Sequence, residues 1–212
     1  MNLSEPPPIE WLGRISFEAA LARQEAEVAA VRAGASIGRL FLLEHESVYT
    51  IGRTRDQSSL LLRDHLPAPL HEINRGGQAT WHGPGQLVGY AILDLHHHGG
   101  DLVRYLRFLE EVLIDALTHW QLEGRRRDGL TGVWVDDRKI ASIGVGVRHW
   151  ISMHGFGLNV CGSLDGFASI IPCGISGVDM TSVERECGRP VTVKEVADVV
   201  GERFAALLPS LQ

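Results

Sequence analysis

The order of its apolar patterns is the feature that most limits what this chain can fold into. Three segments show helical spacing, and each begins at a residue that can cap a helix. Ser16 precedes the first helix, which we expect to stop near Gly34. Thr192 and Glu195 stand at capping-box spacing before the last. Asp101 precedes the second, whose apolar face is formed by Leu102, Leu106, Leu109, Leu113 and Leu117.

Between the predicted helices lie short apolar runs that are typical of strands. Two of them flank the polar residues 136–138, a spacing that predicts a β-hairpin. Hairpins mixed with longer connections favour the α/β or α+β class, with a mixed β-sheet flanked by helices. A length of 212 residues suits one domain, so we expect residues 1–212 to form a single domain. The predicted strands are residues 39–43, 48–51, 87–95, 133–135, 140–147 and 151–160.

Charge and composition exclude several classes of protein. The formal charge is −6 and the pI is about 5.9, whereas a nucleic-acid-binding protein usually carries a basic excess. No run approaches the ~18 apolar residues of a membrane span, and the first residues carry no secretory signal. Three cysteines without a CxxC spacing favour a reducing compartment over a disulfide framework or a cysteine zinc site. We therefore expect a cytoplasmic protein that binds neither nucleic acid nor membrane.

A dense basic run occupies Arg125, Arg126 and Arg127. Runs of like charge usually lie on a solvated surface, because the charges repel one another and need water around them. The alternative is a small docking patch for an acidic partner. The sequence leaves both interpretations open.

A glycine-rich segment, residues 75–86, is the densest signal in the chain. Its four glycines allow the backbone to approach a ligand closely or to adopt positive φ angles. Arg75 and His82 add groups that can bind an oxygen anion or a carbonyl. The segment has neither the Gly-Lys-Ser/Thr ending of a Walker loop nor the Gly-x-Gly-x-x-Gly pattern of a dinucleotide site. It indicates a ligand-binding loop, or a turn-rich surface loop whose glycines serve geometry alone.

Lys139 begins an otherwise apolar strand, and the alternation of strand side chains puts it on the same face as Ala141 and Ile143. If that face is covered, the ammonium group loses solvation and the lysine becomes a usable base. The alternative is a lysine at a strand end that reaches into water, which is the commoner place for this residue.

Cys173 stands between Pro172 and Gly174, a context that predicts a tight turn rather than regular packing. A thiol on a turn can face a cleft, with neighbouring amides free to bind an oxyanion. Thiolate chemistry needs a partner that stabilises the anion, and Lys139 is the logical one, brought close by the fold. Cys161 and Cys187 lack such a context, so we expect them to be inert.

Ten histidines raise the question of a metal site. Residues 96–98 are three adjacent histidines, which need a further convergent ligand before they hold a metal, so we expect an exposed loop there. His154 differs because small residues follow it. It is placed to approach the same ligand as the glycine-rich segment, and a purely structural histidine fits equally well.

Three segments together resemble the lipoyl(octanoyl) transferase family, in order and in spacing. They are residues 75–86, residues 139–144 (Lys-Ile-Ala-Ser-Ile-Gly) and residues 172–175 (Pro-Cys-Gly-Ile). Residues 44–52 (Glu-His-x-x-Val-Tyr-Thr-x-Gly) and 154–159 support the match. The resemblance implies the fold of lipoate and biotin protein ligases, a mixed sheet flanked by helices with the ligand across the sheet.

The resemblance also implies residue roles. Cys173 forms an acyl-thioester intermediate, and Lys139 lowers the pKa of its thiol. The acyl chain lies against three short segments. Gly157 stands where alanine is commoner in the family, so the preferred chain length depends on this position. The implied substrate-binding residues are Arg75, Gly76, Gly77, Gln78, Ala79, Thr80, Trp81, His82, Ser142, Ile143, Gly144, Gly155, Phe156 and Gly157.

The implied partners are two kinds of protein. The donor is octanoyl-acyl carrier protein, whose phosphopantetheine arm carries the octanoyl (or lipoyl) group as a thioester. The acceptor is a lysine of the lipoyl domains of 2-oxoacid dehydrogenase complexes or of the glycine cleavage H protein, and the transfer is the first step of endogenous protein lipoylation. Because a thioester and an acyl-cysteine have similar energies, we expect neither ATP, cofactor nor metal. Covalent catalysis of this kind divides one transfer into two easier steps.

Three alternatives compete with this interpretation. A lipoate protein ligase activates the free acid with ATP and needs no cysteine nucleophile, so the segment around Cys173 argues against it. A non-enzymatic acyl-binding module would not need Lys139, His82 and Cys173 together. A cysteine hydrolase fits less well, since no Cys-His-Asn order is evident.

Overall fold

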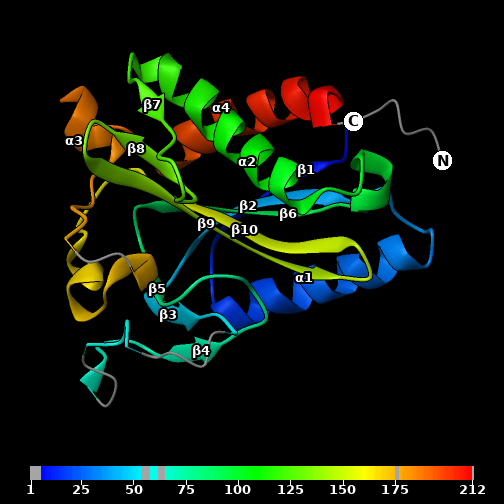
Figure 1. The fold of residues 1–212 in the computed structure, drawn as a ribbon, viewed down its shortest axis with the longest axis horizontal. Helices are drawn as coiled ribbons and strands as arrows, with labels where there is room; N and C mark the ends of the chain where they lie inside the picture. The colour runs from blue at the N-terminus through cyan, green and yellow to red at the C-terminus, as the bar shows by residue number, and fades with distance from the viewer. Residues whose placement is uncertain (1–5, 54–57, 62–64, 175–176, 212) are drawn as a thin grey trace.

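A seven-stranded mixed sheet forms the centre of the computed structural model, which describes residues 6–53, 58–61, 65–174 and 177–211 (Figure 1). Its strands lie in the order β1-β2-β6-β10-β9-β8-β7. The pair β1 and β2 is parallel, and the other neighbours are antiparallel. The strands are β1 (Ile9–Ile15), β2 (Arg39–His45), β6 (Gln86–Ile92), β7 (Gly124–Arg125), β8 (Val133–Val135), β9 (Arg138–Arg148) and β10 (Ile151–Asn159).

A smaller, three-stranded sheet lies below the large one in Figure 1, with the order β4-β3-β5. The pair β3 and β4 is parallel, whereas β3 and β5 are antiparallel. Its own apolar cluster includes Tyr49, Trp81 and Phe167. The strands are β3 (Val48–Ile51), β4 (Leu70–Glu72) and β5 (Thr80–His82).

The helices begin at the predicted caps. Ser16 accepts a hydrogen bond from the amide of Ala19, and Thr192 accepts one from the amide of Glu195. Asp101 accepts from two amides of the second helix. These side chains satisfy amide groups that have no partner within a helix. The helices are α1 (Phe17–Arg32), α2 (Leu102–Leu117), α3 (Val183–Cys187) and α4 (Val193–Leu207), with 3-10 turns at Leu95–His98, Thr118–Trp120, Asp165–Ser169, Pro172–Gly174 and Leu208–Leu211.

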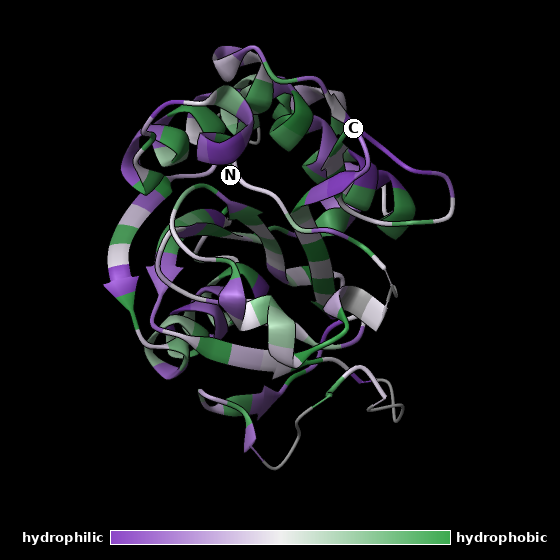
Figure 2. Cartoon of the chain, turned by 90° about the vertical axis from the view of Figure 1, so that its left-hand side faces the viewer, coloured by the Kyte–Doolittle hydropathy of each residue, from purple (hydrophilic) through white to green (hydrophobic). Residues whose placement is uncertain are grey.

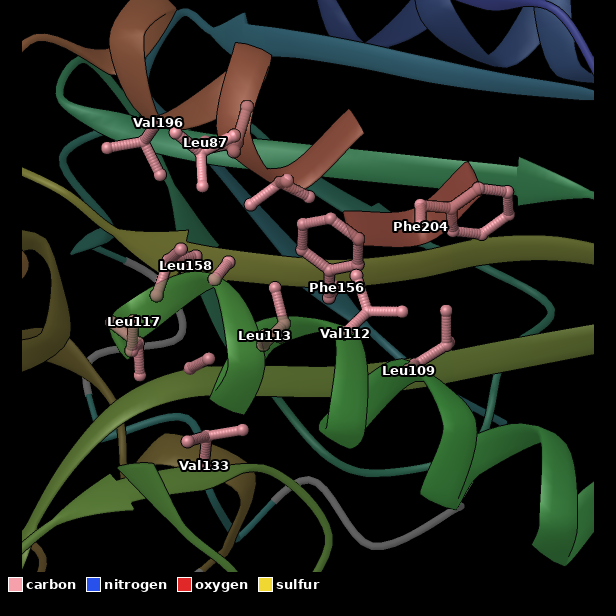
Figure 3. Packing of buried hydrophobic residues seen from close by; sticks show 14 of the residues in the cluster. Leu87, Leu109, Val112, Leu113, Leu117, Val133, Phe156, Leu158, Val196 and Phe204 are labelled. Atoms are coloured by element: carbon pink, nitrogen blue, oxygen red, sulfur yellow. The ribbon is translucent and has the colours of Figure 1, made fainter. Parts of the chain in front are cut away.

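Helices cover both faces of the large sheet, α2 and α4 on one and α1 on the other (Figure 1). Alternate residues of β2 serve the two faces: Leu40 and Leu42 belong to the cluster under α2 and α4, and Phe41 and Leu43 to the cluster under α1. The strands of the sheet are accordingly mostly hydrophobic (green in Figure 2). The helices outside the sheet carry both hydrophobic and hydrophilic residues, shown in green and purple. The larger cluster fills the space between α2, α4 and the sheet (Figure 3). The predicted mixed sheet flanked by helices is confirmed.

Two antiparallel strand pairs matter for the site, and the first is the predicted hairpin. The strands β8 and β9 form the hairpin around residues 136–138. In β9 and β10, Ser142 lies opposite Gly157 and Gly144 opposite Gly155. The two segments that the sequence assigned to one ligand are therefore neighbours in the sheet.

The structure departs from the predicted elements in several places. The strands β1, β4 and β7 and the helix α3 were not predicted, and β5 lies inside the predicted loop of residues 75–86. At the start of α2, Leu102 is 39% exposed rather than part of the core. Within the described residues, no helix is both long enough and apolar enough to cross a bilayer.

Candidate active site

A cavity of about 340 Å³ lies where the glycine-rich segment crosses β9 and β10. The structure brings most of the predicted substrate-binding residues together around it. They come from three separate segments of the chain, which meet only through the fold. The predicted residues that line it are Arg75, Gly76, Gly77, Gln78, Thr80, His82, Ser142, Ile143, Gly144, Gly155, Phe156 and Gly157.

The remaining two predicted residues, Ala79 and Trp81, lie on the other side of the segment. Both are buried in the cluster of the small sheet, where the Trp81 ring packs edge-on against Phe167. The alternation of side chains along β5 explains this, because Thr80 and His82 then face the cavity while their neighbours face away.

Close packing favours glycine where the segments cross. The amide of Gly76 donates to the carbonyl of Val145 at 2.9 Å, so the glycine-rich segment lies directly on β9. A Cβ atom at Gly144 would come within 3.1 Å of Arg75 Cδ and 3.2 Å of the Gly76 carbonyl oxygen. The bare backbone thus lets the segment approach, and it leaves the space beside β9 and β10 open.

Several lining residues were not singled out from the sequence. Leu102 and Leu106, in the first turns of α2, line the cavity, and Leu106 also packs against the apolar cluster. Their position at the start of a leucine-rich helix could have indicated a role in lining a cavity, because the apolar helix face extends beyond the sheet there. The others carry no local signal, and they are Phe17, Ile73, Tyr90, Gly129, Leu130, Thr131 and Val145. His154, which the sequence placed near the same ligand, also lines the cavity.

His82 is held as a neutral imidazole with a defined tautomer. The amide nitrogen of Gln86 donates to Asn159 Oδ1 at 2.9 Å, so Gln86 turns its oxygen to His82 Nδ1, 2.6 Å away. Nδ1 must then carry the proton, and Nε2 keeps its lone pair. Burial lowers the pKa of His82 to about 3, and the nearby His45 and Arg75 add to this effect.

His154 faces the same cavity from β10 with φ at +60°, a conformation that is unusual for any residue except glycine. Its amide donates to Gln24 Oε1 at 2.8 Å, and its Nδ1 is buried with no hydrogen-bond partner among the described residues. Burial, followed by the charge of Arg75, lowers the pKa of His154 to about 4. Both cavity histidines are therefore uncharged at neutral pH.

Arg75 is the buried cation of the cavity wall. Its guanidinium donates to the carbonyl and the hydroxyl of Thr50 at 2.9 and 3.0 Å, and to the Gly76 carbonyl at 2.9 Å. These bonds fix Arg75 across the start of the glycine-rich segment. It therefore orders that segment, besides lining the cavity.

Lys139 is completely buried, with 0% of its surface exposed. The interpretation of a strand-end lysine reaching into water is therefore wrong. Its Nζ donates to the carbonyl of Thr131 at 3.2 Å and lies 4.9 Å from the centre of the Trp134 ring. Lys139 stands directly behind the part of the cavity wall that Thr131 forms.

The side chain of Cys173 lies outside the described residues, but its backbone belongs to the turn Pro172–Gly174. A Cβ atom at the next residue, Gly174, would come within 2.4 Å of Gln78 Oε1, so this turn abuts the cavity wall. The chain then returns to Lys139, whose amide donates to the Asp179 carbonyl at 2.8 Å. The turn of Cys173 thus abuts the cavity wall, and a segment that follows it in the chain is paired with Lys139.

A continuous set of hydrogen bonds links His82 to that segment. Gln86 bonds His82 and Asn159, and Asn159 Nδ2 donates to the Thr181 carbonyl at 2.9 Å. The amide of Thr181 in turn donates to the carbonyl of Lys139 at 2.9 Å. All these side chains are buried, so the network orders the cavity end of β10 and the start of β9 together.

Cys161, Cys187 and the tandem histidines are not among the residues that line this cavity. Burial raises the pKa of the Cys161 thiol, and Cys187 lies near the carbonyl oxygens of Glu184 and Arg189. The tandem histidines belong to the 3-10 turn Leu95–His98, which is largely exposed, in agreement with the exposed loop predicted there. Within the described part of the chain, no three His, Cys, Asp or Glu side chains gather as a metal ligand set would.

The arginine run is engaged by carboxylates of this same chain. Arg125 pairs with Glu123 at 2.6 Å, Arg126 pairs with Glu110 at 3.0 Å, and Arg127 pairs with Asp137. The run thus lies at the surface, as the first interpretation expected, and each of its arginines is paired with a carboxylate.

The architecture is that of the lipoate and biotin ligases. A lipoate-protein ligase A bound with ATP superposes with a TM-score of 0.75 at 16% identity, covering 96% of this chain and 85% of that one. Biotin protein ligase from Aquifex aeolicus gives a TM-score of 0.58 at 16% identity, covering 97% and 70%. At such low identity these likenesses establish the fold alone.

The sequence relatives define the family. A profile of the lipoyl protein ligase A/B catalytic domain matches residues 16–205, and the chain belongs to this family. An octanoyltransferase from Geobacter sulfurreducens is 52% identical over 196 residues, which are 92% of this chain and 82% of that protein. An octanoyltransferase from Synechococcus elongatus is 54% identical over 167 residues, 78% of this chain and 71% of that one. The resemblance predicted from the sequence is confirmed.

Proposed function

We propose that this protein is an octanoyltransferase that moves an octanoyl (or lipoyl) group from acyl carrier protein to a lysine of a lipoyl domain. Relatives that are about 50% identical over most of the chain bear the name octanoyltransferase, which supports the class of reaction. The carrier-protein donor, the Cys173 intermediate and the accepting proteins are the finer parts of the proposal.

The observation that carries the proposal is that a buried lysine and the turn of Cys173 both adjoin the wall of the cavity. Lys139 lies behind the part of the wall formed by Thr131, and the turn Pro172–Gly174 abuts Gln78. An acyl group on Cys173 would enter at this end and extend along Gly144 and Gly155 toward Val145. The uncharged histidines suit an uncharged acyl chain.

The first half of the reaction moves the acyl group onto the enzyme. The Cys173 thiolate attacks the thioester carbonyl of the donor, a new carbon–sulfur bond forms, and the bond to the phosphopantetheine sulfur breaks. A cationic Lys139 beside the thiol stabilises the thiolate and delivers a proton to the departing pantetheine sulfur.

The second half moves the acyl group to the acceptor. The lysine amine of the lipoyl domain attacks the acyl-Cys173 carbonyl, an amide forms, and the bond to the cysteine sulfur breaks. The proton lost by the amine returns to Lys139, which restores the starting state. Lipoyl domains of 2-oxoacid dehydrogenase complexes and the glycine cleavage H protein are the proposed acceptors. The reaction needs no cofactor or metal, because the thioester donor supplies the driving force.

A comparison of two donors tests the proposal against the ligase alternative, which the fold alone permits. The protein is incubated with a lipoyl domain and either octanoyl-acyl carrier protein or octanoate with ATP and magnesium. We expect octanoylation of the domain from the carrier thioester without ATP. Activity from octanoate and ATP alone would assign the protein to the ligases. Cys161→Ser and Cys187→Ser are matched controls that should keep the activity, whereas Cys173→Ala should lose it.

A further inference from the structure

A buried glutamate on α2 lies close to the candidate site, and the reaction above does not use it. Glu110 has 0% of its surface exposed, which is rare for a carboxylate. Helical spacing puts it on the same face as the cavity-lining Leu106 and the core residue Leu113. A buried carboxylate is destabilising unless its charge and its lone pairs are satisfied.

Two arginines satisfy one of its oxygens. Arg107 Nη1 and Arg126 Nε lie 2.7 and 3.0 Å from Glu110 Oε2. Arg126 also donates to the Arg107 carbonyl at 3.1 Å. The middle arginine of the basic run therefore balances a buried charge.

The other oxygen binds the loop that packs against Lys139. Glu110 Oε1 accepts a hydrogen bond from the amide of Gly132 at 3.1 Å. Gly132 has φ at +133°, and a Cβ atom there would lie 2.8 Å from Lys139 Cε and 3.2 Å from Lys139 Nζ. The preceding residue, Thr131, supplies the carbonyl that accepts from Nζ. The hydrogen bond between Gly132 and Glu110 thus fixes the position of Thr131 and Gly132, the two residues against which the Lys139 side chain packs.

We propose that Glu110 is a positioning residue for Lys139, which it holds through Gly132 and Thr131 without touching it. Of the three donor directions of the ammonium group, the Thr131 carbonyl takes one and the Trp134 ring lies against the group. These contacts fix the position of the ammonium group. The role in catalysis rests on the proposed function, whereas the hold on Lys139 does not.

The chain offers a direct probe, because Lys139 and Lys194 are its two lysines. Protein labelled with carbon-13 at lysine Cε should give two NMR signals. Lys194 is a reference, since its side chain is 51% exposed on α4 and pairs with Asp198. Lys139 should be displaced from it by the ring current of Trp134.

Three variants separate the hydrogen bond from the ion pairs. Glu110→Gln keeps an oxygen that can accept from Gly132. The double variant Glu110→Met with Arg126→Met removes that acceptor while replacing the charge pair by apolar side chains, a change that folds tolerate well. Glu111→Gln is the matched control, because Glu111 also pairs with Arg126 but has no bond to Gly132.

The proposal predicts that the Lys139 signal moves toward that of Lys194 in the double variant and stays in place in the two glutamine variants. Transfer should follow the same order, with kcat about tenfold to a hundredfold lower in the double variant and the KM for donor little changed. An unmoved Lys139 signal in the folded double variant would overturn the proposal. Full transfer by Lys139→Met would instead refute the proposed role of the lysine, and the NMR result would still decide the position of its side chain.

Discussion

The two faces of the β9–β10 region have different roles in the molecule. On one face, α2 and α4 cover an apolar cluster that includes Leu113, Val196 and Phe204 (Figure 3). At the cavity, the buried polar residues Arg75, His82 and His154 surround the space, and they are held by hydrogen bonds to Thr50, Gln86 and Gln24, respectively. The apolar cluster stabilises the fold, and the cavity contributes the chemistry. Substitutions on the two faces should therefore have separable effects.

Lys139→Met should sharpen this contrast most strongly. Methionine fills a similar space next to Trp134 but carries no ammonium group. We expect kcat for octanoyl transfer to fall by about 10²–10⁴, which is typical for loss of a proton-transfer group. Lys139→Arg should not restore transfer, since arginine does not release its proton. Rates from octanoyl-acyl carrier protein, together with urea unfolding, check both points; wild-type rates in either variant would remove the lysine from the mechanism.

Phe204→Ala is the opposite test. Phe204 is fully buried on α4, with its ring 5.4 Å from that of Phe108. Truncation should lower the free energy of unfolding by about 3–5 kcal/mol through lost burial and the cavity left behind. The kcat of the folded fraction should stay within about twofold of wild type. A large loss of kcat in protein shown to be folded by circular dichroism would break the separation of the two faces.

The loss of stability at acidic pH should reveal that His82 and His154 are uncharged in the folded protein. Their pKa values of about 3 and 4 lie below the ordinary 6.5, so below pH 6.5 the unfolded chain binds protons that the folded protein does not. Each histidine then removes about 2 kcal/mol of stability between pH 6.5 and pH 5. Replacing His154 by Asn, which tolerates a positive φ, should flatten this loss by about half. Urea unfolding at both pH values measures it, with exposed His119→Gln as the control that should change nothing.

The length of acyl chain that the enzyme prefers should depend on the end of the cavity that lies away from Lys139. A Cβ atom at Gly146 would lie 2.1 Å from the Asn74 carbonyl, so Ile73 lines the cavity beyond Val145, away from Lys139. Ile73→Phe should exclude the last one or two methylenes, and each is worth about 0.8 kcal/mol. We expect kcat/KM to fall about tenfold for an eight-carbon donor and little for a four-carbon one. An equal loss for both donors would move the acyl tail elsewhere.

The helices and the large sheet were predictable because their signals are local. Ser16, Asp101 and Thr192 cap helices where the sequence placed them, and the β8–β9 turn lies where the apolar pattern breaks. The strand β1 was missed because Glu10, Gly13 and Arg14 interrupt its alternation at the edge of the sheet. An edge strand buries too little for a strong pattern.

The site was predictable only as a set of motifs. The glycine-rich segment and residues 142–144 were assigned to one ligand, but the burial of Lys139 depends on Gly132 and Trp134 from other parts of the chain. Glu110 had one signal that was not used, its position between Leu106 and Leu113 on an apolar helix face. A charged residue at such a position requires partners, and the sequence does not show which ones.

The most direct test of the central claim is the intact mass of the enzyme after mixing with octanoyl-acyl carrier protein in the absence of a lipoyl domain. The account predicts a mass increase of one octanoyl group, mapped by peptide analysis to Cys173 and lost when a lipoyl domain is added. The adduct should be absent in Cys173→Ala and unchanged in Cys161→Ser and Cys187→Ser. An enzyme that octanoylates the lipoyl domain while forming no adduct, or that carries its adduct on another residue, would contradict the account.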